Sequence, residues 1–218
     1  KFLTNVSKIF RKNIDTNIIA ITGSCGKTTL KELLGNTLNK ISKVSISSKS
    51  YNNKFGVPLS LFNIDQKDEF GILEVGMDKK GEIDYLSKII EPDVGVITNI
   101  NYAHAKNFKY IKQIALAKSE IIDNISPYGF IVLNADDIFF KLHYNIAKKK
   151  NIKVISFGIK NLKTDIKLIN IKQFRKKFRI NISLNNKRKY FLLSNDFQNN
   201  ICNILSALAV ISIYKNLF

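Results

Sequence analysis

Short apolar runs alternate with helix-like patterns over the first 160 residues. Five runs have the length and predominantly apolar character of buried strands: residues 18–21, 70–76, 94–99, 130–134 and 153–158. Between them, apolar residues spaced three or four apart predict helices. Strands that alternate with helices indicate an α/β fold, with a mostly parallel sheet and helices on both faces. The expected helices cover residues 1–15, 83–90 and 110–125 and begin at residues 28 and 59, and a short strand is expected at 43–47.

The pattern changes after Asp165. Residues 178–184 alternate between apolar and polar positions, and residues 189–193 alternate again. Asn185-Asn186, between these two stretches, is typical of a tight hairpin turn. Residues 165–195 are therefore predicted to form a small antiparallel sheet appended to the main one. A closing helix is expected from Phe197 onward.

Length and composition fit one large domain. The chain has 218 residues, of which 45% are hydrophobic, and no apolar run approaches the roughly 20 residues needed to cross a bilayer. It begins with Lys1 rather than Met and has no signal-peptide pattern, which suggests a piece excised from a longer protein. Two cysteines, Cys25 and Cys202, give neither a disulfide framework nor a metal-site spacing. We expect a cytoplasmic protein that acts as a monomer and has no membrane contact.

The net charge of +18 is unevenly distributed. Residues 141–190 hold 16 Lys or Arg residues and one acidic residue, so +15 of the total lies there. A basic region of this size can bind nucleic acid. Its aromatic residues, however, are scattered along the sequence and match no RNA-binding signature. Lys, Asn and Ile are abundant throughout, as in an AT-rich coding sequence, so we favour a solvated basic surface over a nucleic-acid site.

The clearest chemical motif is Thr22-Gly23-Ser24-Cys25-Gly26-Lys27-Thr28-Thr29, between the strand at 18–21 and the helix that follows. We call residues 22–28 the glycine loop. Glycines allow backbone N–H groups to turn toward an anion, and the helix N-terminus adds partial positive charge. Lys27 is placed to meet β- and γ-phosphates, and Thr28 to bind Mg²⁺ through its hydroxyl. The loop is shorter than the usual phosphate-binding loop, but its strand and helix favour nucleotide binding over a simple turn.

Other polar residues end predicted strands. Glu74, Asn99 and Asn134 each follow or end a buried run, as Gly23 does. Ligand sites of parallel α/β sheets lie at the carboxyl ends of the strands, so we expect these residues to share one edge. Glu74 by itself fits either a capping residue or a metal or base site.

Five further segments accompany the glycine loop. They are Asn52-Asn53-Lys54-Phe55-Gly56-Val57-Pro58-Leu59, Glu74-Val75-Gly76 with Gly81-Glu82-Ile83, Thr98-Asn99-Ile100 with Ala103-His104, Ala117-Lys118-Ser119-Glu120-Ile121, and Leu133-Asn134-Ala135-Asp136-Asp137. In this order they resemble the motifs of the Mur ligase family, and most of all its D-alanyl-D-alanine-adding branch. The resemblance covers almost all of residues 1–218, but only the central, P-loop NTPase-like ATP-binding domain. It implies that an amino-terminal UDP-substrate domain and a carboxy-terminal ligase domain are absent from this chain.

The resemblance also implies residue roles. Catalysis would involve Lys27, Lys118 and His104. Nucleotide contacts would come from Gly23, Ser24, Cys25, Gly26, Lys27, Thr28, Thr29, Asn99, Asn200 and Asn203. Magnesium would be held by Thr28, Glu74, His104 and Lys118, the last as a carbamate formed with CO₂, while Asn52 and Asn53 would lie on the substrate side. The chain departs from the family at Asn199, where His is usual, and at Lys109-Tyr110, where Gly-Ser is common.

The implied activity is an ATP-dependent, ADP-forming amide ligation. ATP and Mg²⁺ would phosphorylate a carboxylate of UDP-N-acetylmuramoyl-tripeptide, and the amine of D-alanyl-D-alanine would displace the phosphate. Residues 1–218 alone are expected to be inactive, because the holders of both substrates are missing. Two alternatives stay open: another muramyl-peptide or folylpolyglutamate-type ligase, and a non-enzymatic nucleotide-binding module with a nucleic-acid-binding basic surface.

Overall fold

The computed structural model describes residues 2–48, 51–102, 107–161, 163–175, 177–194 and 200–214. One nine-stranded sheet runs through these residues, in the order β2-β3-β1-β4-β5-β6-β7-β8-β9. The pairings from β2 to β7 are parallel, and those of β7 with β8 and β8 with β9 are antiparallel. The predicted α/β fold with a mostly parallel sheet and a small antiparallel part is confirmed.

Except for β7, which was not predicted, the strands lie close to the predicted segments. They are β1 (Asn17–Thr22), β2 (Val44–Ile46), β3 (Phe70–Glu74), β4 (Val94–Ile97), β5 (Phe130–Asn134), β6 (Lys153–Gly158), β7 (Ile166–Phe174), β8 (Lys177–Leu184) and β9 (Lys187–Leu193). After β1 the chain passes to β2 and β3 on one side and then to β4 on the other. The order of the strands therefore reverses at β1, and a crevice at such a reversal is where α/β sheets bind ligands.

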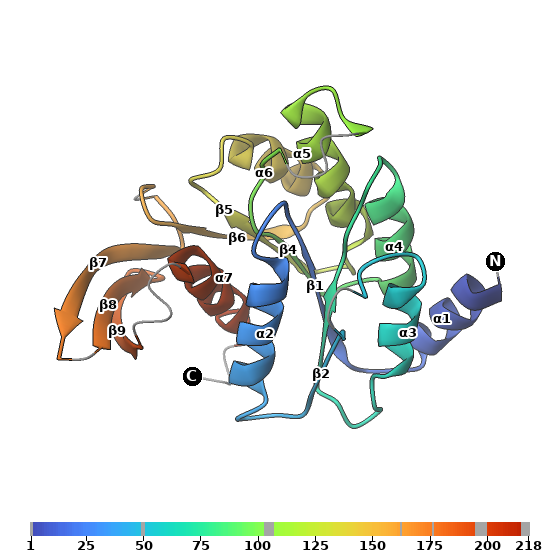
Figure 1. Ribbon diagram of the computed structural model, residues 1–218, viewed down its shortest axis with the longest axis horizontal. Helices are drawn as coiled ribbons and strands as arrows, with labels where there is room; N and C mark the ends of the chain where they lie inside the picture. The colour runs from blue at the N-terminus through green and yellow to red at the C-terminus, as the bar shows by residue number, and fades with distance from the viewer. Residues whose placement is uncertain are drawn as a thin grey trace.

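Helices cover both faces of the sheet (Figure 1). They are α1 (Phe2–Lys12), α2 (Lys27–Leu38), α3 (Gly56–Phe62), α4 (Glu82–Ile90), α5 (Ile111–Ser119), the 3-10 helix η2 (Glu120–Asn124), α6 (Phe140–Lys149) and α7 (Ile201–Ile211). Helices α2 and α7 pack together over one face, and the other helices lie over the opposite face. Among the described residues, no helix is both long and apolar enough to cross a membrane.

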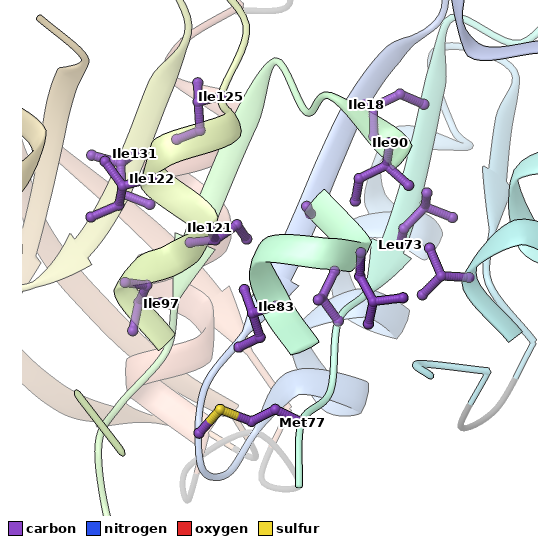
Figure 2. Close-up of a cluster of buried hydrophobic side chains, with 14 of the residues drawn as sticks. Ile18, Leu73, Met77, Ile83, Ile90, Ile97, Ile121, Ile122, Ile125 and Ile131 are labelled. Carbon is purple, nitrogen blue, oxygen red and sulfur yellow. The ribbon is translucent and has the colours of Figure 1, made fainter. Parts of the chain in front are cut away.

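Strand β1 divides the hydrophobic core into two layers because its side chains alternate between faces. Ile18 and Ala20 belong to the cluster under α3, α4 and α5, whereas Ile19 and Ile21 belong to the cluster under α2 and α7. All four are fully buried. Figure 2 shows part of the first layer, where side chains of α4 and η2 meet those of the central strands. A strand buried on both faces explains why residues 18–21 read as an unbroken apolar run.

The hairpin between β8 and β9 forms as predicted. Asn185 and Asn186 have φ angles of 48° and 65°, the left-handed values that a two-residue hairpin turn of this kind requires. Strand β7 pairs with β6 at one edge and with β8 at the other. The antiparallel strands therefore extend the main sheet and do not form a separate sheet.

Several helices differ from the prediction: α1 ends at Lys12 and not at residue 15, α6 was not predicted, and two others have different limits. Helix α3 begins at Gly56, three residues earlier than expected, because the Asn53 side chain accepts hydrogen bonds from the backbone N–H groups of Phe55 and Gly56. The predicted helix at 110–125 is α5 followed by η2, which begins at Glu120. The Glu120 carboxylate accepts bonds from the N–H groups of Gly81 and Asp84, at the start of α4. Phe197 lies outside the described residues, and α7 begins at Ile201.

Candidate active site

The glycine loop has a shape that its two glycines make possible. Gly23 has a φ angle of 145°, and a Cβ atom added to it would lie 1.9 Å from Oγ1 of Thr98. Gly26 has a φ angle of 82° and stands at the N-cap of α2. A Cβ on Gly26 would lie 2.9 Å from Oδ1 of Asn203. Both positions therefore need glycine, for conformation and for space.

The end of β4 braces the loop. The Thr98 hydroxyl donates to the carbonyl of Cys25 at 2.7 Å, and Oδ1 of Asn99 accepts the Cys25 N–H at 3.0 Å. Asn99 also donates its amide to that same carbonyl. The Ser24 hydroxyl donates to the carbonyl of Asn101 at 2.9 Å. The structure thus brings Asn99 to the loop as predicted, where its side chain holds the loop backbone in place.

Helix α2 presents its amino end to the space beside the loop. In the described part of the chain, no side chain caps this end, and the first N–H groups of a helix have no partner within it. Lys27 is the first residue of α2, and its ammonium group donates to the carbonyl of Gly23 at 3.0 Å. None of the ion pairs among the described residues involves Lys27. Its charge and the helix end together suit a bound anion.

Thr28, on the first turn of α2, lies against Glu74 at the end of β3. The Thr28 hydroxyl donates to Oε2 of Glu74 at 2.8 Å, and the amide of Asn52 donates to Oε1 at 2.8 Å. Glu74 is almost fully buried, whereas Thr28 is exposed. Asn52 packs against Gly76, where an added Cβ would lie 2.9 Å from its side chain. Asn52 therefore fixes the orientation of the Glu74 carboxylate.

Two residues that hold the site together, Lys31 and Ser47, could not be recognised from the sequence. Lys31 is fully buried in α2, and its ammonium group donates to the carbonyl of Ser47 at 2.6 Å. The hydroxyl of Ser47 accepts the backbone N–H of Glu74 at 3.2 Å. This chain of contacts ties α2 to the segment after β2 and to the end of β3. A lysine in an amphipathic helix reads as a surface residue, so the sequence pattern alone could not have identified it.

Lys118 reaches the glycine loop from α5. Its side chain is 2% exposed, and its ammonium nitrogen donates to the carbonyl of Gly23 at 2.9 Å. Lys27 donates to the same carbonyl oxygen, so two amino groups converge there. Burial, and after it the nearby charge of Lys27, together lower the pKa of Lys118 to about 7, while Cys25 acts in the opposite direction. Its surroundings therefore favour the neutral amine of Lys118 over the ammonium.

The remaining predicted residues surround the loop to different extents. Asn203, on the first turn of α7, lies against Gly26, and Asn200 precedes α7 at its N-cap. Cys25 and Thr29 are exposed at the loop. Asn134 turns to its own segment, where its side chain accepts the N–H of Asp136 at 3.0 Å. His104 and Asn199 lie outside the described residues.

The sequence of this chain was compared with known protein families. The model of the Mur ligase middle domain matches residues 21–211, which is most of the chain. The chain belongs to the Mur ligase family. The resemblance seen in the sequence motifs is thereby confirmed.

Named relatives of this Mur ligase chain agree with each other. It is 38% identical over 155 residues, 70% of its length, to the UDP-N-acetylmuramoyl-tripeptide--D-alanyl-D-alanine ligase of Buchnera aphidicola subsp. Acyrthosiphon pisum, covering 33% of that protein. It is 33% identical over 218 residues, 99% of its length, to the enzyme of the same name from Buchnera aphidicola subsp. Baizongia pistaciae, covering 46% of that protein. The chain therefore spans less than half the length of these relatives.

Solved structures match this fold closely. MurF from Acinetobacter baumannii has a TM-score of 0.85 and 29% identity, over 95% of this chain and 45% of that one. MurF ligase from Thermotoga maritima, in complex with ADP, has a TM-score of 0.85 and 25% identity, over 98% of this chain and 49% of that one.

The residues of this Mur ligase site suit Mg²⁺. The hydroxyl of Thr28 and the carboxylate of Glu74 are hard oxygen donors that already point at each other. Mg²⁺ is usually held by one or two carboxylates, together with waters and substrate phosphates. The described residues contain no group of three His, Cys, Asp or Glu side chains that could hold a metal by themselves. The oxygen donors of Thr28 and Glu74 therefore fit Mg²⁺ in chemical type.

Proposed function

We propose that this chain is the nucleotide-binding part of an ATP-dependent ligase that adds D-alanyl-D-alanine to UDP-N-acetylmuramoyl-tripeptide in peptidoglycan synthesis. One observation carries the proposal: the glycine loop places Lys27 at a helix N-terminus, with Thr28 facing the buried carboxylate of Glu74. The names of the relatives and the ADP bound to the MurF ligase from Thermotoga maritima support it. The substrates are carried over from those names, because the chain spans under half of the relatives.

The proposed roles follow from charge. Joining a carboxylate to a γ-phosphate brings two anions together, so the site must neutralise them. Lys27 and the N–H groups that begin α2 would bind the β- and γ-phosphates. Thr28 and Glu74, held by Asn52, would hold Mg²⁺, which when bound neutralises phosphate charge and orients the phosphate for in-line transfer. Asn200 and Asn203 would lie on the nucleoside side of the loop, and Asn52 and Asn53 on the substrate side.

Lys118 is proposed to act as a carbamate. As an ammonium it would stand beside Lys27 and repel a metal ion, and it has a carbonyl rather than a carboxylate for a partner. Addition of CO₂ to the neutral amine, with loss of one proton, forms an N–C bond and gives an anion with two oxygens. Such an anion would attract Lys27 and offer Mg²⁺ the oxygen ligands it prefers. The lowered pKa of Lys118 supports this, because only the neutral amine reacts.

The setting of the proposed enzyme is the cytoplasm, where it would act as a monomer. Both cysteines, Cys25 and Cys202, are free and exposed, which suits a reducing compartment. Sedimentation of the full-length protein would test the expected monomer.

The test is phosphate release by the full-length protein. Release should require UDP-N-acetylmuramoyl-tripeptide and D-alanyl-D-alanine together, and single amino acids such as glutamate should not replace the dipeptide. Lys27→Ala should reduce turnover at least about a hundredfold, as loss of a charge-stabilising donor does. Lys40→Ala, which removes an exposed lysine just beyond the other end of α2, should leave turnover unchanged. Normal turnover by Lys27→Ala would refute the nucleotide site, and stimulation by glutamate alone would point to another ligase.

A further inference from the structure

Strands β7, β8 and β9 have one face that the core does not use. The pairing Lys172–Arg179–Leu192 and the pairing Asn181–Tyr190 place their side chains on the same side of the sheet, because directly opposed residues point the same way. We define this outer face by the following residues: Asn170, Lys172, Phe174, Lys177, Arg179, Asn181, Arg188, Tyr190 and Leu192. The opposite face carries Ile180 and Ile182, which are fully buried in the core with α7.

The outer face is positively charged without acidic neighbours in its own segment. Residues 166–194 contain nine Lys or Arg residues and no Asp or Glu. Five of the basic residues, Lys167, Lys172, Lys177, Arg179 and Arg188, lie on this side of the sheet, and none of the ion pairs among the described residues includes Lys172, Lys177, Arg179 or Arg188. A surface of this kind attracts a polyanion. Figure 1 shows these strands extending beyond α7 at one end of the molecule.

Two aromatic rings stand among these charges. The Arg179 guanidinium lies 4.9 Å from the ring centroid of Phe174 and 4.8 Å from that of Tyr190, so the rings hold it between them. Phe174 is 40% exposed and Tyr190 62% exposed, and they come from strands on either side of β8. The sequence pattern scatters these aromatics 16 positions apart, whereas the sheet brings them to one cation. Exposed aromatics on a basic sheet face are the stacking platforms of single-stranded nucleic-acid binders.

We propose that the outer face of β7–β9 binds single-stranded RNA. Bases stack on the exposed sides of Phe174 and Tyr190, and Lys172 and Arg188 contact phosphates. Asn170 and Asn181 share a hydrogen bond of 2.6 Å, and their remaining amide donors and acceptors bind ribose 2′-hydroxyls. Contact with the 2′-hydroxyl is what favours RNA over DNA. An anionic membrane fits less well, because the exposed apolar side chains here are few and stand between charges. This inference is independent of the proposed ligase activity.

The experiment measures binding of fluorescent oligo(U) to the full-length protein over a series of salt concentrations. Binding should weaken steeply with salt. Lys172→Gln should make the negative slope of log K against log[salt] shallower by about 0.7, as expected for the loss of one phosphate contact. The matched control, Lys149→Gln, removes an exposed lysine of α6, outside β7–β9, and should change the slope less. Failure to bind oligo(U) at low salt, or equal effects of the two variants, overturns the proposal.

A second variant separates stacking from charge. Phe174→Leu combined with Tyr190→Leu keeps apolar side chains and all charges, and should weaken oligo(U) binding about fivefold or more. Its affinity for inorganic polyphosphate, which has no bases, should be unchanged, and oligo(dU), which lacks only the 2′-hydroxyls, should bind the wild type more weakly than oligo(U). An equal loss for polyphosphate, equal binding of oligo(dU), or retention on anionic phosphatidylglycerol vesicles without oligo(U) binding would each refute it. Circular dichroism checks that the variant is folded.

Discussion

Gly26 and Gly81 have nearly the same backbone conformation in very different surroundings. Their φ angles are 82° and 88°, and each stands at the N-cap of a helix. A Cβ on Gly26 would press on Asn203, whereas a Cβ on Gly81 would meet nothing within 4 Å. The pair therefore separates the cost of a left-handed conformation from the cost of disturbing the glycine loop.

We expect both alanine substitutions to lower the free energy of unfolding by about 1–2 kcal/mol, since each places a Cβ in the left-handed region. Gly26→Ala should also weaken ATP binding, because Asn203 must move away from the loop. Gly81→Ala should keep wild-type affinity. Urea unfolding and nucleotide titration measure the two effects, and equal ATP affinity in both variants would contradict a nucleotide role for this contact.

Lys118 gives a second prediction for a single residue. Lys118→Ala should abolish ligation in the full-length enzyme, and short-chain carboxylic acids should restore part of it by replacing the carbamate oxygens. Lys112→Ala, an exposed lysine of the same helix, serves as the control and should remain active. Wild-type protein in ¹³C-bicarbonate should show a carbamate carbon signal that Lys118→Ala lacks. Full activity of the unrescued Lys118→Ala variant would exclude the carbamate role.

The sequence predicted some of these residue contacts and not others. Glu74 could be placed beside the glycine loop because β3 and β1 are neighbouring parallel strands whose carboxyl ends share one edge, a rule that depends only on topology; Thr28 follows that loop on α2. The same rule placed Asn134 at the site, but its side chain closes a turn with Asp136 instead. The approach of Lys118 to Gly23 spans 95 positions and depends on how α5 packs. Only the family resemblance could single that lysine out.

At the scale of elements, two of the missed features come from local interruptions of a pattern. Strand β7 was not predicted, because its alternation breaks at a bulge between Leu168 and Asn170. The change from α5 to η2 at Glu120 follows from a carboxylate that binds the start of another helix. The spacing of apolar residues reveals neither the bulge in β7 nor the change of helix type at Glu120. It averages over a whole segment and carries no information about contacts with distant residues.

His143 links α6 to α5 and makes stability depend on pH. It is 2% exposed, its Nε2 lies 3.1 Å from the carbonyl of Ala115, and burial lowers its pKa, partly opposed by this bond and by Asp137. In the unfolded chain its pKa is about 6.5. Below that pH the unfolded state takes up a proton that the folded state binds more weakly. Its contribution to stability is therefore complete above pH 6.5 and is lost as pH falls.

We expect the free energy of unfolding to fall on acidification below pH 6.5, with a His143-dependent slope of at most about 1.4 kcal/mol per pH unit. His143→Gln keeps a side chain that can donate to Ala115 but cannot take up a proton in this range, so its acid slope should be shallower. Lys141→Gln, on the exposed side of α6, should keep the wild-type slope. Chemical unfolding at pH 7.5 and 5.5 measures the change in the free energy of unfolding with pH. A wild-type slope in His143→Gln would contradict the role of His143 in this pH dependence.

At the scale of the whole molecule, binding and ligation have different requirements. The described residues form one continuous sheet with two core layers, and the glycine loop, Lys27, Thr28 and Glu74 all lie at its central strands. The residues proposed to bind the nucleotide all lie within this chain. Ligation also needs the two other substrates aligned with the phosphate, and the relatives that perform it are more than twice as long as this chain.

We therefore expect residues 1–218, produced alone, to fold cooperatively and bind ATP with Mg²⁺ weakly, without forming an amide bond. Holding reactants in line contributes roughly 7–11 kcal/mol toward a barrier, and a domain that holds only the nucleotide forgoes that contribution. Calorimetric titration with ATP tests whether the chain binds nucleotide, and mass spectrometry of the reaction products tests whether it forms an amide bond. Lys27→Ala in the same 218-residue chain should lose nucleotide binding and keep its unfolding transition, which ties the binding to the glycine loop. Measurable ligation by the isolated chain would show that substrate positioning also resides within these residues and would refute the division of roles.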